Sequence, residues 1–110
     1  MNELVWSADD FSRVPYRAFT EQEVFAREQE RLFCGPVWCY LALEAEIPKQ
    51  GDYVVTFVGN IQVVVNRAQD DTIHAFVNRC AHRGTTLVRD LAGKASGYTC
   101  IYHNWCYDLK

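Results

Sequence analysis

Residues 53–77 read YVVTFVGNIQVVVNRAQDDTIHAFV. β-Branched and aromatic residues gather there in short runs, and turn signals separate the runs. Gly59-Asn60 is typical of a two-residue hairpin loop, and Asp70-Asp71 marks a second turn. The stretch therefore predicts three antiparallel strands, at Tyr53–Val58, Ile61–Asn66 and Thr72–Val77.

A fourth strand is predicted upstream of this stretch. Val37–Leu43 is apolar and aromatic, and a turn at Pro48–Gly51 separates it from the next strand. Short strands joined by short turns favour a mostly β fold, a small antiparallel sandwich or barrel, over a parallel sheet. The fold class predicted for the chain is thus mostly β.

A helix is predicted before the strands. Thr20 and Glu23 have the spacing of a capping box, in which the two side chains satisfy free backbone donors at a helix start. Apolar residues then recur at helical intervals until Gly35-Pro36 ends the pattern. The expected helix covers about Glu21–Phe33 and precedes the β domain.

Composition excludes several classes of function. The chain has 110 residues, enough for one domain, and a net charge of −3 with no basic block to follow a phosphate backbone. Nucleic acid is therefore not an expected partner. Val37–Leu43 is the longest apolar run, far short of the roughly 20 residues that span a membrane, and Met1–Asp10 carries no targeting signal. We expect no membrane association and a cytoplasmic location.

Two Cys/His pairs follow the predicted strands. Cys80 and His82 form C-x-H, and Cys100 and His103 form C-x-x-H, in two polar loops. A thiolate and an imidazole from each loop would give a metal centre two sulfur and two nitrogen ligands. The other cysteines, Cys34, Cys39 and Cys106, are expected to be small buried hydrophobic residues.

A tetrahedral zinc site is the alternative reading of these ligands, since zinc also accepts two Cys and two His. Zinc modules usually pair like ligands at two to four residues' separation, whereas each pair here is mixed. The sequence around both pairs instead resembles the Rieske iron–sulfur family, with Cys-Ala-His-Arg-Gly at residues 80–84 and Tyr-His-Asn-Trp-Cys-Tyr-Asp at residues 102–108. The resemblance implies a 2Fe–2S cluster with Cys80 and Cys100 on one iron and His82 and His103 on the other.

The resemblance extends to one branch of that family. Rieske proteins of respiratory complexes have an extra Cys in each loop and a Ser near the cluster, where this chain has Thr85, Tyr102 and Trp105. Because Trp105 replaces that Ser, the cluster lacks one hydrogen-bond donor, which implies a low reduction potential. The chain is similar instead to the N-terminal part of the α subunit of bacterial aromatic-ring-hydroxylating dioxygenases, in particular those acting on anthranilate, salicylate or benzoate. Four upstream segments share this likeness: Ser12–Pro15, Glu30–Phe33, Val37-Trp38 and Ile47-Pro48.

This likeness implies an arm and helix at residues 1–36 and a Rieske 2Fe–2S domain at residues 37–110, incomplete at its C-terminus. It also implies an oxidoreductase whose Rieske domain relays electrons from an NAD(P)H-dependent reductase or a ferredoxin to a mononuclear non-haem iron. Other α subunits in a trimer, and a β subunit, are further implied partners. The catalytic domain is expected to be missing, because His74 is the only histidine outside the two pairs. The 110 residues alone are therefore predicted to be catalytically inactive, with no catalytic residue among them.

A stand-alone Rieske-type ferredoxin is the alternative function. Such carriers reach their first ligand early in the sequence. Here a helix and a proline-containing arm precede Cys80, which favours the oxygenase subunit.

Overall fold

The computed structural model describes residues 6–10 and 12–110, so part of the N-terminal stretch assessed for a targeting signal lies outside the described residues. The chain divides into two compact units, Met1–Trp38 and Cys39–Lys110. No helix among residues 6–10 and 12–110 is both long and apolar enough to cross a membrane.

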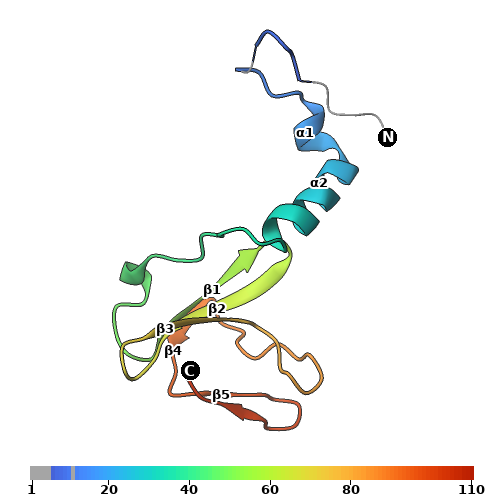
Figure 1. The fold of residues 1–110 in the computed structure, drawn as a ribbon. Helices are drawn as coiled ribbons and strands as arrows, with labels where there is room; N and C mark the ends of the chain where they lie inside the picture. Colours follow the sequence, from blue (N-terminus) through green and yellow to red (C-terminus); the bar gives the residue numbers. More distant parts are fainter. Residues whose placement is uncertain (1–5, 11) are drawn as a thin grey trace. The chain divides into compact units, whose positions relative to one another are not determined.

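The first unit is helical. A short α1 at Arg17–Thr20 is followed by α2 at Gln22–Glu28, which continues as the π-helical turn η1 at Gln29–Phe33 (Figure 1). The helix predicted at Glu21–Phe33 is therefore confirmed, with its last part wound as a π-helix. The predicted capping box is wrong: Glu21 is the N-cap, and the Thr20 hydroxyl donates to the Tyr16 carbonyl.

The second unit is built on an antiparallel sheet of four strands in the order β3-β2-β1-β4 (Figure 1). Its strands are β1 at Asp52–Val58, β2 at Ile61–Arg67, β3 at Ile73–Val77 and β4 at Ala92–Lys94. Val58 pairs with Ile61 across the two-residue loop, where Gly59 has a φ of 56°. The second turn contains Asp71 with a φ of 66°. The turn predicted at Pro48–Gly51 is present as well, with the Asp52 N–H donating to the Lys49 carbonyl at 3.0 Å. All three predicted turns and three of the four predicted strands are confirmed.

Val37–Leu43 is not a strand, so that prediction is wrong. Of this segment, Val37, Tyr40 and Leu43 are exposed, while Leu41 and Ala42 pack beside a small core. Strand propensity expresses how well side chains fit a pleated, half-buried surface. A segment with this propensity forms a strand only where a sheet edge is available for pairing. The segment instead leads into the 3₁₀ turn η2 at Glu44–Glu46.

Strand β2 is buried on both faces and divides the core into two clusters. Val63 and Val65 pack with Ile47 on one face. Val64 lies on the other face in a cluster completed by five residues: Tyr53, Ala68, Val88, Tyr98 and Leu109. Strand β2 is therefore covered on both sides, which explains why it has three successive buried valines at residues 63–65.

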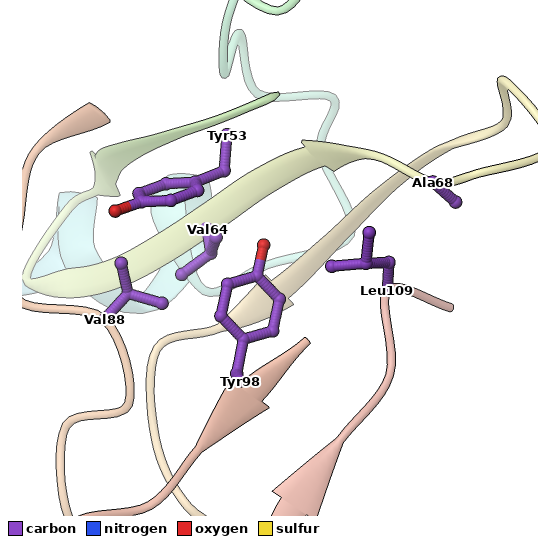
Figure 2. Packing of buried hydrophobic residues seen from close by; sticks show 6 residues of the cluster. All are labelled: Tyr53, Val64, Ala68, Val88, Tyr98 and Leu109. Atoms are coloured by element: carbon purple, nitrogen blue, oxygen red, sulfur yellow. The ribbon is translucent and has the colours of Figure 1, made fainter. Parts of the chain in front are cut away.

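Tyr98 anchors a second, two-stranded sheet to the first. This hairpin pairs β5 at Tyr98–Thr99 with β6 at Cys106–Tyr107. Figure 2 shows the Tyr98 ring projecting into the cluster toward Val64, and its centroid lies 6.0 Å from that of Tyr53 and 5.3 Å from that of Phe76. Burial raises the pKa of Tyr98 to about 12, so its hydroxyl is neutral at physiological pH. The hairpin loop is thus fixed against the large sheet.

Candidate metal centre

The two predicted ligand loops have the same backbone design. In residues 80–85, the Cys80 N–H donates to the Thr85 carbonyl at 2.7 Å, and the Gly84 N–H donates to the Cys80 carbonyl at 2.8 Å. In residues 100–105, Cys100 N–H donates to the Trp105 carbonyl at 2.8 Å and Asn104 N–H to the Cys100 carbonyl at 2.9 Å. We call these segments loop 1 and loop 2.

The fifth residue of each loop takes a left-handed conformation. Gly84 has a φ of 79° and Asn104 a φ of 60°. Glycine tolerates this region freely, and asparagine is among the residues that enter it most readily. Asn104 therefore preserves the turn that Gly84 makes in loop 1, and the two loops curl in the same way despite different sequences.

This shared design brings the four predicted ligands to one end of the second unit. Loop 1 follows β3, loop 2 follows β5, and the two loops lie next to each other (Figure 1). Cys80 and Cys100 are each 2% exposed. His82 and His103 are exposed, with ring centroids 4.8 Å apart at an angle of 74°. The arrangement has thiols inside and imidazoles outside.

The donor set suits an iron–sulfur cluster shared between two irons. Two buried thiols and two imidazoles combine the soft and intermediate donors found in mixed Cys/His clusters. Among the residues that the structure describes, no group of three or more His, Cys, Asp or Glu side chains could hold a single metal ion. In a Rieske-type cluster one iron takes two Cys ligands and the other takes two His ligands, which is the number of each that the two loops offer.

Tyr107 of β6 connects loop 2 to loop 1. Its hydroxyl lies 3.1 Å from the Cys80 Sγ and accepts a hydrogen bond from the Ala81 N–H at 3.0 Å. The hydroxyl can donate to a Cys80 thiolate, and it is the main cause of a lowered pKa of the Cys80 thiol. The same contact raises the pKa of Tyr107. A thiolate is the form that binds metal, so this contact favours ligation.

Asn78 fixes the base of loop 1. Its side chain is 4% exposed, and its Nδ2 donates to the Gln62 Oε1 at 2.9 Å and to the Val88 carbonyl at 2.7 Å. Its Oδ1 accepts from the Leu87 N–H at 3.2 Å and from the Val88 N–H at 2.8 Å. One buried amide therefore ties the end of β3 to β2 and to the segment that follows loop 1.

Neither Tyr107 nor Asn78 was a predicted site residue. Tyr107 reaches loop 1 only through the register of β5 and β6, and no local periodicity reveals a strand of two residues. The prediction for the other cysteines is also wrong, because Cys34 and Cys106 are exposed and Cys39 is half-buried.

The sequence profile of the Rieske [2Fe-2S] domain matches residues 37–110. The chain belongs to the Rieske [2Fe-2S] domain family. Its cofactor is accordingly a 2Fe–2S cluster, as the sequence predicted.

Similar proteins include the large subunit of a dioxygenase and the large oxygenase component of a hydroxylase. The chain is 55% identical over 100 residues to the anthranilate 1,2-dioxygenase large subunit of Burkholderia cepacia, covering 91% of this chain and 24% of that protein. It is 44% identical over 105 residues to the large oxygenase component of salicylate 5-hydroxylase from Ralstonia sp, covering 96% and 25%. The chain thus spans about a quarter of the length of these relatives.

Solved structures agree with the fold. The chain superposes on naphthalene 1,2-dioxygenase from Rhodococcus sp. with a TM-score of 0.80 and 40% identity, covering 86% of this chain and 21% of that one. A quaternary ammonium Rieske monooxygenase in complex with L-carnitine gives a TM-score of 0.77 at 34% identity, covering 86% and 27%. The predicted mostly β Rieske fold and the similarity to dioxygenase α subunits are confirmed.

Tyr107→Phe is expected to lower the reduction potential of the Rieske protein. A hydrogen bond to a ligand sulfur stabilises the reduced, more negative state. A net worth of 0.5 to 1.5 kcal/mol corresponds to roughly 20 to 65 mV for one electron. Redox titration of the visible spectrum measures the shift, with Tyr102→Phe as a control that also removes a phenol hydroxyl near the loops. An unchanged or raised potential in Tyr107→Phe would contradict the role given to this hydroxyl.

Proposed function

We propose that this chain is the electron-entry domain of an aromatic-ring-hydroxylating oxygenase large subunit. One observation carries the proposal: two buried thiols and two exposed imidazoles meet at the tip of two matching loops in a Rieske domain. In this proposal residues 1–36 are an arm and helix, and residues 37–110 bind the cluster.

Four side chains have ligand roles in the proposal. Cys80 and Cys100 hold one iron from inside the fold, and His82 and His103 hold the other from the exposed side. When bound, a 2Fe–2S cluster supplies a centre that takes up and releases one electron at a time. The exposed imidazoles give a redox partner close approach, while the buried thiols exclude water from the opposite side.

The partners belong to the proposal as well. Electrons would come from an NAD(P)H-dependent reductase or a ferredoxin and go to a mononuclear non-haem iron outside these 110 residues. The similar proteins are named as large subunits and oxygenase components, which supports an assembly of several subunits. For this assembly we propose a trimer of α subunits joined by a β subunit. We place the assembly in the cytoplasm, with neither a membrane nor a nucleic acid as partner.

Arg83 is a candidate contact in this assembly. It lies in loop 1 beside the ligand His82, its guanidinium carbon is 5.8 Å from the Tyr102 ring centroid, and it forms no ion pair within the described chain. A cation held over an aromatic ring next to the imidazoles could pair with a carboxylate of a neighbouring subunit.

The substrate class we propose is an aromatic carboxylate. Anthranilate and salicylate name two similar proteins, and terephthalate names a third, at 42% identity over 107 residues. The residues that would select the substrate belong to the catalytic domain, so this proposal rests on sequence similarity. The relatives are oxygenase subunits, which favours this function over a stand-alone Rieske ferredoxin.

The purified chain tests this function directly. We expect brown protein with about two irons and two acid-labile sulfides per chain. It should be reduced by NAD(P)H through a reductase of this enzyme class and should form no hydroxylated product from anthranilate, salicylate or benzoate. Colourless protein containing zinc would overturn the proposal, and turnover by the chain alone would overturn its role as a relay.

A further inference from the structure

Aromatic contacts cross between the two loops. The Trp105 indole of loop 2 lies parallel to the His82 imidazole of loop 1, with centroids 4.6 Å apart and an interplanar angle of 11°. The His82 and His103 rings also meet edge to face. His82 is thus bounded by a flat aromatic surface from the opposite loop and by the second imidazole.

Trp105 itself is held by the backbone design of loop 2. Its carbonyl accepts the Cys100 N–H, and the following residue, Cys106, begins β6, whose pairing fixes the chain direction. One face of the indole lies on His82. Because Trp105 is 47% exposed, part of its ring faces solvent. An aromatic ring in this place covers one face of the imidazole.

His103 also contacts an aromatic ring, but the two rings are less parallel. Tyr102 lies next to His103 in the same loop, with centroids 3.9 Å apart but tilted by 38°. Adjacent residues approach closely through chain connectivity alone, so this contact says little about positioning. The parallel contact of Trp105 joins residues 23 positions apart in different loops and therefore depends on the fold.

We propose that Trp105 is a positioning residue for His82, lying flat on the imidazole to fix its plane and to shield one face from water. The proposal rests on the ligand role that the proposed function gives to His82. Residues that contact metal-bound histidines orient them and control the access of solvent to the metal. In this protein the orienting group is an aromatic face instead of a hydrogen-bond acceptor.

Three variants of the full chain separate stacking from simple packing. Trp105→Phe keeps a flat ring, Trp105→Leu keeps apolar bulk without a ring, and Trp105→Ala removes both. Tyr40→Ala is the matched control, because Tyr40 is another exposed aromatic residue of the second unit, at 73% exposure. The readouts are the histidine nitrogen couplings in pulsed EPR of the reduced protein and the rate of cluster loss to an iron chelator.

We expect Trp105→Phe and Tyr40→Ala to retain the wild-type nitrogen couplings and cluster lifetime. Trp105→Leu and Trp105→Ala should broaden the couplings and lose the cluster about two- to tenfold faster, the range that corresponds to one aromatic pair. Failure of the leucine variant to load, with the phenylalanine variant loaded, would also support the proposal. Equal behaviour of the leucine and phenylalanine variants, or no change in any variant, would overturn it. Wild-type protein without a 2Fe–2S spectrum would instead overturn the proposed function.

Discussion

His103→Ala is expected to abolish the visible absorption and the EPR signal of the reduced cluster. In the proposed centre each iron takes two protein ligands, and the second iron has only His82 and His103. Both imidazoles are exposed at the tip, and among the described residues no third histidine lies nearby to substitute, because His74 is on β3, where its Nε2 contacts the Thr72 hydroxyl at 2.8 Å. Iron analysis and EPR of the purified variant measure the loss.

His74→Ala is the matched control for this experiment. The chain has three histidines, so the pair of variants compares a proposed ligand with the one histidine outside the centre. His74→Ala should retain the iron content and the spectrum of the wild type. Retention of an unchanged spectrum by His103→Ala would show that His103 is not a ligand.

Asn78→Ala is expected to lower the free energy of unfolding by about 2 to 4 kcal/mol. The substitution removes four hydrogen bonds and leaves the Leu87 and Val88 N–H groups and the Val88 carbonyl without partners at a buried site. Such groups cost more than the bonds themselves are worth, since water cannot reach them. Chemical denaturation followed by circular dichroism measures the change.

Gln62→Ala is the comparison for Asn78→Ala. It removes only the hydrogen bond between Gln62 Oε1 and Asn78 Nδ2, which is half-buried, and should cost about 0.5 to 1.5 kcal/mol. Asn78→Ala should also lose its cluster faster, because Asn78 holds both ends of loop 1. Equal, small losses of stability in the two variants would contradict the role of Asn78 as the base of that loop.

The strands that could be predicted from the sequence are those with a local signal. β1, β2 and β3 combine β-branched runs with a Gly-Asn and an Asp-Asp turn, and their bounds agree with the structure to within one residue at each end. Val37–Leu43 is also apolar and aromatic but is not a strand, because propensity alone does not supply a pairing partner. β4, β5 and β6 have two or three residues each, too few for any periodicity.

The residues of the candidate site also divide into those with a local sequence signal and those without one. Cys80, His82, Cys100 and His103 were predicted because metal ligands leave a spacing pattern in the sequence. Tyr107 and the stacking of Trp105 on His82 were not predicted, since both contacts cross from one loop to the other and depend on how the hairpin packs on the large sheet.

Pulsed EPR of reduced protein carrying ¹⁵N-labelled histidine is the most direct test of the ligand assignment. Two distinct histidine nitrogens coupled to the cluster are predicted for the wild type, and both should persist in His74→Ala. A spectrum without histidine nitrogen couplings, or a protein that shows no signal because it holds zinc, would contradict the assignment of His82 and His103 to one iron of a shared cluster.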